Sequence, residues 1–257
     1  MHLQNLWAYR ELLYFLVWRD VKIRYKQTLL GAAWAIVQPL LTMLVFTLIF
    51  STVANIDSNG IPYPVFAYAA LWPWTFFANA ITTSGQSVVA SAALVTKVYF
   101  PRLIVPVAAV CAGLVDLAVA FPILVALLAY YQTGLTPNLL MLFPLVLLTT
   151  LLATAVGIWL SALNVKYRDV KFAIPFLVQI WLYLSPVAYP ATAVPAQWRV
   201  LYSVNPLVGI IEAYRAALFG RAFDWGAMLV SLVITLGVVA YALHQFRRME
   251  KEFADIL

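Results

Sequence analysis

An all-α membrane protein with six transmembrane helices is the fold class that this sequence predicts, from its composition, its uncharged runs and the placement of its basic residues. Of the 257 residues, 65% are hydrophobic and 10% are charged, whereas soluble domains carry about 25% charged residues. Residues 27–56 contain no charged side chain, and about 20 apolar residues suffice to cross a hydrocarbon core of about 30 Å. A soluble domain of this length has too little interior to bury so much apolar surface.

Six segments are apolar and long enough to cross the bilayer. They are residues 30–53, 63–88, 103–130, 139–163, 172–189 and 225–246. The uncharged stretch between Asp116 and Lys166 would form about 74 Å of helix, which exceeds two bilayer cores, so the chain must turn once within it. Residues 132–138, with a glycine and a proline, have the composition of that turn.

The basic residues predict the orientation. With six crossings, thirteen of the sixteen Lys and Arg residues lie on the side that holds both termini, against Arg199, Arg215 and Arg221 on the other. The positive-inside rule therefore predicts that both termini lie in the cytoplasm, and we expect a multi-pass protein of the cytoplasmic (inner) membrane. The net charge of +6 reflects this topology and not a nucleic-acid-binding surface, so we expect no nucleic acid partner.

The chain is expected to form a single transmembrane domain, residues 1–257, with a cytoplasmic tail at 247–257. Its first segment, residues 1–26, is expected to form an amphipathic helix along the cytoplasmic interface. A helical winding puts Leu6, Tyr9, Leu13, Leu16 and Val17 on one face, and Glu11, Arg19, Lys22 and Lys26 on the other.

Residues 190–223, before the last span, are expected to lie on the outer face. Two apolar runs, 200–204 and 207–218, are too short to span, which favours short re-entrant or interfacial helices. Glu212 and Arg215 are three residues apart, close enough to pair on one helix.

No catalytic or metal-binding set is evident. Cys111 is the only cysteine, His2 and His244 are near opposite ends of the chain, and no glycine-rich phosphate-binding loop occurs. If ATP drives this protein, a separate subunit must hydrolyse it. Asp116 is the acid that lies inside a predicted span, and a structural bond to a hydroxyl or amide of a neighbouring helix is favoured over a role in transport.

Two predicted cytoplasmic loops combine charges with aromatic side chains. Residues 96–102 and 164–169 would suit docking to another protein or simple anchoring of the topology. The deeper aromatic residues, Trp159, Trp181 and Tyr183 among them, would suit contact with sugar rings or helix packing equally well.

These same segments carry a resemblance to a known family. Residues 97–106 (KVYFPRLIVP), 164–169 (NVKYRD), 184–190 (LSPVAYP) and 205–207 (NPL) resemble the permease subunits of ABC-type exporters of polysaccharides, the O-antigen, capsule and teichoic acid export family. Residues 19–26 (RDVKIRYK), 30–35 (LGAAWA) and Gln38-Pro39 are similar to that family's first span. The likeness covers essentially the whole chain in the right order.

The resemblance implies a homodimer around a central channel, driven by two copies of a nucleotide-binding ATPase subunit that holds the ATP and Mg, with no cofactor bound by this chain. It also implies roles for particular residues. Lys97, Tyr99, Phe100, Pro101 and Arg102 would couple to the ATPase, and Tyr167, Arg168 and Asp169 would form a cytoplasmic gate. Trp34, Trp181 and Tyr183 would line the channel, and Asn205, Pro206, Glu212 and Arg215 would form an outer gate.

The expected function is ATP-driven export of a lipid-linked polysaccharide, an O-antigen-like glycan, by a chain that is not itself an enzyme. One alternative is a permease of the same architecture for a lipid, drug or peptide. A second is an ion-coupled carrier, which would work without an ATPase and would require Asp116. A membrane-embedded glycosyl-transfer enzyme is disfavoured because the outer loop at 132–138 contains no acid.

Overall fold

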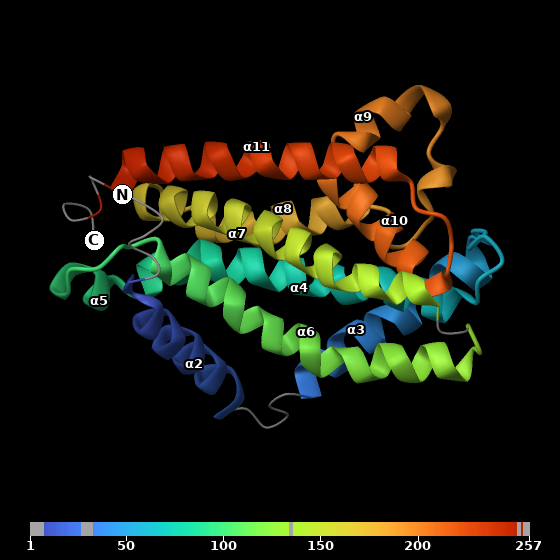
Figure 1. The fold of residues 1–257 in the computed structure, drawn as a ribbon, viewed down its shortest axis with the longest axis horizontal. Helices are drawn as coiled ribbons and strands as arrows, with labels where there is room; N and C mark the ends of the chain where they lie inside the picture. The colour runs from blue at the N-terminus through green and yellow to red at the C-terminus, as the bar shows by residue number, and fades with distance from the viewer. Residues whose placement is uncertain (1–7, 27–32, 134–135, 251–252, 254–257) are drawn as a thin grey trace.

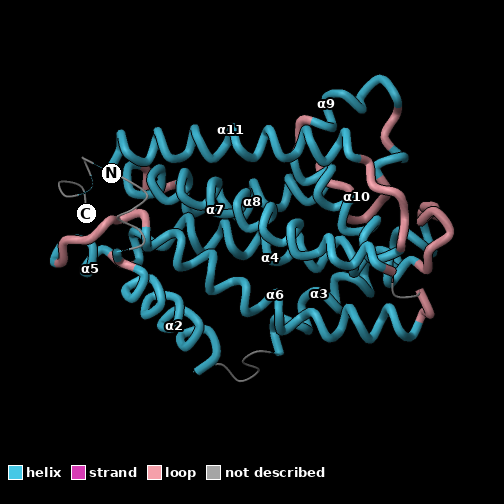
Figure 2. The backbone as a smooth tube through the Cα atoms, in the orientation of Figure 1, coloured by secondary structure: helices cyan, strands magenta, loops and turns pink. Residues whose placement is uncertain are grey.

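The protein is a bundle of helices in a computed structural model that describes residues 8–26, 33–133, 136–250 and 253 (Figure 1). Within these ranges the backbone forms helices, turns and loops, and contains no strand (Figure 2). The elements in chain order are α2 (Arg10–Lys26), α3 (Ala33–Phe46), the π-helix η1 (Thr47–Val53), α4 (Tyr63–Ala90), α5 (Ala92–Lys97), α6 (Ile104–Tyr130), η2 (Pro137–Met141), α7 (Leu142–Lys166), α8 (Val170–Tyr183), η3 (Ala191–Ala193), η4 (Ala196–Trp198), α9 (Arg199–Ser203), α10 (Pro206–Phe219) and α11 (Trp225–Glu250).

The central helix of the bundle is α4, which contacts α3, α6, α7, α8 and α10. Small residues allow the closest of these approaches. A Cβ added at Gly157 of α7 would lie 2.4 Å from Oγ of Ser84 in α4. The same Ser84 hydroxyl donates to the carbonyl of Pro106 in α6, at 3.0 Å. Glycine and serine thus bring three helices together, as is common where helices associate within a membrane.

Four helical segments in the described part of the chain are long and apolar enough to cross a membrane: Ala33–Val53, Ile104–Tyr130, Pro137–Lys166 and Trp225–Glu250. They correspond to four of the six predicted spans, so the chain is a multi-pass membrane protein by its helices as well as by its composition. The predicted all-helical fold is confirmed.

The other two predicted spans differ from these four. α4 has 28 residues, but its tryptophan, proline and asparagine side chains lower its hydropathy, and most of its side chains are covered by other helices. α8 has only 14 residues, about 21 Å of helix. It ends at Tyr183, where the sequence predicted a span to residue 189, because residues 184–189 form turns. The number of crossings therefore stays a prediction.

The helices place the loops at two ends of the bundle. α4, α7 and α11 finish at the end that carries α5, where α6 and α8 begin (Figure 1). We call this the α5 end. The segments 54–62, 184–205 and 220–224 lie at the opposite end, which we call the α9 end. The predicted cytoplasmic segments 96–102 and 164–169 thus both lie at the α5 end.

The predicted N-terminal helix exists as α2, which packs against α6. Leu16 is buried and Leu13 and Val17 pack partly against the same hydrophobic cluster, as the helical winding predicted. The outer face is more apolar than predicted, since Phe15 and Ile23 are exposed there beside the basic residues. A mixed aromatic and basic face suits the headgroup layer of a membrane. Leu6 lies outside the described residues.

Two short helices, α9 and α10, form within residues 190–223, as predicted. α10 is largely buried against α4, α7 and α11. It ends at Gly220, whose φ of 63° is left-handed and which leaves the amide of Arg221 to donate to the carbonyl of Ala216 at 3.0 Å. The protein therefore covers α10 on most sides, and its relation to the membrane stays a prediction.

Candidate functional site: two bundle ends and a polar cavity

The predicted ATPase-coupling loop joins α5 to α6. Some of its residues are buried or bonded to the rest of the chain, and others are exposed. Phe100 and Pro101 are buried, and Arg102 donates from Nη1 to the carbonyl of Glu250 at 2.7 Å. The Arg102 guanidinium also lies 5.8 Å from the ring centre of Phe253. Tyr99 is 96% exposed. The loop is thus pinned to the C-terminal part of the chain with one tyrosine projecting outward.

A surface depression of about 860 Å³ lies at this loop. Its lining combines the loop with the start of α2 and the end of α11: Tyr9, Val95, Thr96, Lys97, Val98, Tyr99, Phe100, Pro101, Arg102, Arg247 and Glu250. Lys97 is exposed at its rim. Segments far apart in the sequence therefore build one concave basic surface at the α5 end.

The predicted cytoplasmic gate residues form the tight turn between α7 and α8, also at the α5 end. Tyr167, Arg168 and Asp169 are all exposed, and the amide of Val170 donates to the Tyr167 carbonyl at 3.1 Å. The preceding Asn164 is buried and donates to the carbonyl of Gly85 at 3.1 Å. α4 thus anchors the turn, and its three polar residues face outward.

The predicted channel residues lie on two helices and do not form one surface within a single chain. Trp34 of α3 is 52% exposed and Tyr183 of α8 is 58% exposed. Trp181 is partly buried: its indole nitrogen donates to Oδ1 of Asn205 at 2.9 Å, and its ring packs edge-on against Phe77 at 5.1 Å. Trp181 is therefore engaged by its own chain.

At the α9 end, Asn205 is the N-cap of α10 and makes four side-chain hydrogen bonds. Its Oδ1 accepts from the amide of Leu207 at 3.1 Å and from Trp181. Its amide nitrogen donates to the carbonyl of Leu184 at 2.9 Å and to Oγ of Ser185 at 3.0 Å. Pro206 follows at the first helical position, where its missing N–H costs nothing. Asn205 thus joins α8, α10 and the segment between them.

Glu212 and Arg215 form the predicted local pair, with Nη1 and Oε1 separated by 2.8 Å. Arg215 is only 3% exposed, and its Nη2 donates to the carbonyl of Val187 at 2.9 Å. Its guanidinium lies 3.7 Å from the ring centre of Phe66. Glu212 also accepts from the amide of Ala191 at 3.1 Å. We call Asn205, Glu212 and Arg215 the α10 polar cluster; it holds residues 184–191 against the bundle.

The partners of Asp116 lie on α2 and were not predicted from the sequence. Arg24 and Tyr25, at the end of α2, both donate to its carboxylate. Burial and the hydrogen bond to Asp116 raise the pKa of Tyr25, which keeps its donating proton. The expectation of a bond to a neighbouring hydroxyl is therefore met, with an arginine added. The helical winding of α2 could show that Arg24 and Tyr25 are adjacent, but not that they reach α6.

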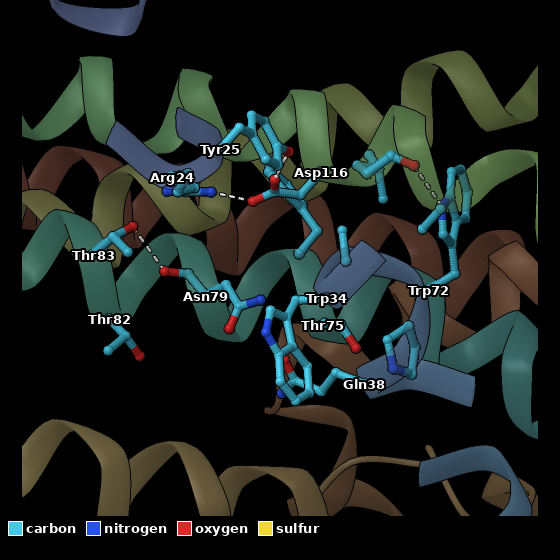
Figure 3. A pocket seen from close by; sticks show the side chains of 15 residues that line it. Arg24, Tyr25, Trp34, Gln38, Trp72, Thr75, Asn79, Thr82, Thr83 and Asp116 are labelled. Carbon is cyan, nitrogen blue, oxygen red and sulfur yellow. Dashed lines mark hydrogen bonds and ion pairs between the residues drawn. The ribbon is translucent and has the colours of Figure 1, made fainter. Parts of the chain in front are cut away.

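Beside this group lies a cavity of about 230 Å³ between α2, α3, α4 and α6 (Figure 3). It is lined by Arg24, Tyr25, Trp34, Ala35, Gln38, Pro39, Trp72, Thr75, Phe76, Asn79, Thr82, Thr83, Asp116, Leu117 and Ala120. No group of three or more His, Cys, Asp and Glu side chains that could hold a metal ion occurs in the described part of the chain.

Comparison with known proteins identifies the family. Residues 11–219 match the ABC-2 type transporter family. The O-antigen export system permease protein RfbA of Myxococcus xanthus is 30% identical over 257 residues, covering 98% of this chain and 97% of that protein. An RfbA of Klebsiella pneumoniae is 28% identical over 256 residues, with coverage of 98% and 97%. The polysialic acid transport protein KpsM of Escherichia coli is 23% identical over 234 residues, with coverage of 87% and 89%. This chain belongs to the ABC-2 type transporter family.

Proposed function

We propose that this chain is the transmembrane subunit of an ATP-driven exporter that moves a lipid-linked, O-antigen-like polysaccharide across the cytoplasmic membrane. One observation carries the proposal: the chain and the O-antigen export permeases match over nearly their whole lengths. The likeness to a polysialic acid transport protein extends the same reading to a second kind of polysaccharide. The chain acts as a permease, and hydrolysis of ATP with its Mg resides in a separate nucleotide-binding subunit.

The proposed topology has six crossings with both termini in the cytoplasm. The four apolar helices account for four crossings, α4 for another, and α8 with the turns that follow it for the last. The basic residues support the α5 end as the cytoplasmic end, because the loops and helix ends gathered there carry Lys97, Arg102, Lys166 and Arg168.

The proposed assembly is a homodimer with two ATPase subunits bound at the α5 end. The exposed Tyr99 and the depression beside it offer a contact that is concave, basic and aromatic, as protein interfaces often are. Phe100 is buried in the same hydrophobic cluster as Ile104 and Val105 of α6, so a movement of the loop would be transmitted to that helix. Tyr167, Arg168 and Asp169 would lie at the cytoplasmic mouth of the channel.

The proposed channel lies between the two subunits, against the exposed faces of α3 and α8 that carry Trp34 and Tyr183. The short helices of the α9 end would surround the outer mouth. There the α10 polar cluster would hold the mouth in shape rather than contact the passing glycan, since most of its polar groups bond within the chain.

Two experiments test the proposal. In the first, this chain is purified from native membranes in mild detergent, and the eluate is analysed by mass spectrometry and an ATPase assay. In the second, the amount of glycan on the cell surface is measured in a host from which the gene is deleted, with and without this chain. We expect a co-purifying protein with a phosphate-binding loop, and loss of surface glycan that this chain restores. An active preparation of this chain alone would favour an ion-coupled carrier. ATPase activity stimulated by a lipid, drug or peptide and not by lipid-linked glycan would favour the other permease class.

A further inference from the structure

The cavity between α2, α3, α4 and α6 combines charged, amide, hydroxyl and aromatic groups inside an otherwise apolar bundle (Figure 3). Its volume of about 230 Å³ equals roughly eight water molecules at about 30 Å³ each. That is room for one small polar ring and not for an extended chain. Polar side chains at membrane depth are costly, which makes such a group of them a candidate binding site.

The Asp116 carboxylate is a fixed acceptor at one wall of this cavity. Arg24 and Tyr25 each donate to one of its two oxygens, and an ionised carboxylate offers about four lone-pair positions. Among the described residues, two of these positions therefore stay open for further donors. The Asp116 and Arg24 side chains are 18% and 24% exposed, so the pair is reachable from the cavity.

Two amides complete the polar lining. Gln38 of α3 and Asn79 of α4 face the cavity, and neither amide makes a side-chain hydrogen bond within the described part of the chain. Each amide offers two donor hydrogens and one acceptor oxygen. Thr75 adds a hydroxyl, and the half-exposed Trp34 ring lies near Asn79 in Figure 3. Donors, acceptors and a flat ring together suit a hydroxyl-rich ring.

The depth of the cavity suits a headgroup of the inner leaflet. Asp116 lies about 21 Å along α6 from Tyr130, at 1.5 Å per residue. In a core of about 30 Å, a span that begins at the outer boundary therefore puts Asp116 within roughly 10 Å of the cytoplasmic one. Arg24 and Tyr25 reach it from α2, the helix expected at that interface.

We propose that this cavity binds one sugar ring of the lipid-linked glycan at the level of the inner leaflet. Asp116 and the amides of Gln38 and Asn79 would hold the ring hydroxyls, and Trp34 would contact the ring face. A phosphate group fits less well, because the Asp116 carboxylate would repel it and the Arg24 guanidinium is already paired with that carboxylate. This inference rests on the proposed function for the identity of the ligand.

The test uses alkyl glycosides with a photoreactive diazirine in the chain: octyl glucoside, mannoside, galactoside and N-acetylglucosaminide. Octyl phosphocholine with the same diazirine is the matched headgroup control. Each probe is irradiated with the permease and its ATPase partner in nanodiscs, and labelled peptides are mapped by mass spectrometry. We expect at least one glycoside to label the cavity-lining parts of α3 and α4 well above phosphocholine, and the free methyl glycoside to compete.

Asn79→Ala and Gln38→Ala should each reduce this labelling about five-fold, as expected for a lost hydrogen bond of about 1 kcal/mol. Thr75→Val, which keeps the side-chain shape, should reduce labelling less. Because it is not expected to disturb folding, it keeps the test valid if the amide variants misfold. Thr42→Ala is the matched control on α3, since the Thr42 hydroxyl bonds its own helix at the Gln38 carbonyl and lies outside the cavity lining. Equal labelling by phosphocholine, or labelling unchanged in both amide variants, would overturn the site.

Failure of the site and failure of the function give different results. If the wild-type chain restores surface glycan while no glycoside labels the cavity, the sugar site is wrong and the exporter stands. If glycosides label the cavity and the amide variants reduce labelling as expected while no glycan reaches the surface, the site stands as a glycoside site and the proposed function is wrong.

Discussion

The two ends of the bundle use their polar and aromatic side chains in different ways. At the α9 end, the charged and amide groups of the α10 polar cluster point into the protein and bond to backbone groups and to one another. At the α5 end, Tyr99 and Arg168 point outward. The position of a charged residue in the sequence therefore does not by itself indicate its role in this chain. Its burial decides whether it shapes the protein or remains available to a partner.

The buried end is also the more demanding one energetically. Arg215 loses its hydration almost completely, which costs several kcal/mol for an isolated ion. The Glu212 carboxylate, two backbone carbonyls and the Phe66 ring replace that hydration. Its Nε has no partner among the described residues, so the replacement is incomplete. Each member of the cluster bonds to a different part of segment 184–191.

The largest effect is expected from Arg215→Met, which would remove the Arg215 donors from the Glu212 carboxylate and from the Val187 and Tyr189 carbonyls. Breaking a buried ion pair typically costs about 3–5 kcal/mol, so we expect a large fall in the apparent Tm and in the yield of monodisperse protein. Glu212→Gln should cost less, because the Glu212 side chain is 32% exposed and Gln can still accept from Ala191. If Arg215→Met has the same apparent Tm as the wild type, the buried pair does not stabilise the protein and the contrast between the two ends is wrong.

A smaller effect is expected from Asn205→Ala, which removes the N-cap of α10 and the bonds to α8. Loss of such a cap costs about 0.5–2 kcal/mol, and the orphaned indole of Trp181 adds to this. Asn205→Asp separates the contributions, since it keeps the acceptor for Leu207 and Trp181 and loses the donor to Leu184 and Ser185. Thermal unfolding should rank wild type above Asp and Asp above Ala. Equal stabilities of the Ala and Asp variants would show that the acceptor contributes nothing.

The sequence was sufficient to predict what depends on local pattern and bulk composition. The helical fold, α2 and its buried Leu16, and the pairing of Glu212 with Arg215 follow from periodicity and spacing. The helix predicted at 172–189 ends earlier, at Tyr183, because residues 184–189 form turns. Hydropathy does not show this, since the turns begin where Asn205 bonds to Leu184 and Ser185. α4 is less apolar than the four candidate spans, and other helices cover most of its side chains, so its crossing stays a prediction.

Long-range polar contacts could not be predicted from one sequence. Asp116 and Arg24 are 92 residues apart, and Arg215 reaches a carbonyl 28 residues away. No periodicity relates residues at such separations, because only the packing of helices brings them together. The cavity beside Asp116 depends on four helices at once, so its existence, unlike the presence of its residues, required the structure.

Arg102→Ala tests the pinned part of the α5 end. It removes the bond to the Glu250 carbonyl and the contact with the Phe253 ring, for an expected loss of about 1 kcal/mol. Arg102→Lys should recover part of this, because an ammonium can donate to the carbonyl but lacks the planar guanidinium that packs on the ring. Apparent Tm measures the loss, and ATPase activity of the complex measures coupling. If Arg102→Ala keeps the wild-type Tm and ATPase activity, the contact between the loop and the end of α11 contributes to neither stability nor coupling.

Tyr99→Ala is the sharpest test of the contrast, because Tyr99 is almost fully exposed and its removal leaves no cavity in the chain. We expect no measurable change in Tm or yield, but binding of the ATPase subunit weakened about five-fold or more, as for an aromatic residue at the centre of an interface. Tyr167→Ala, another exposed tyrosine at the same end, is the matched control and should affect ATPase binding less. If Tyr99→Ala instead lowers stability as Arg215→Met does, the two ends do not differ in kind; if it changes neither stability nor ATPase binding, the α5 loop is not the docking surface.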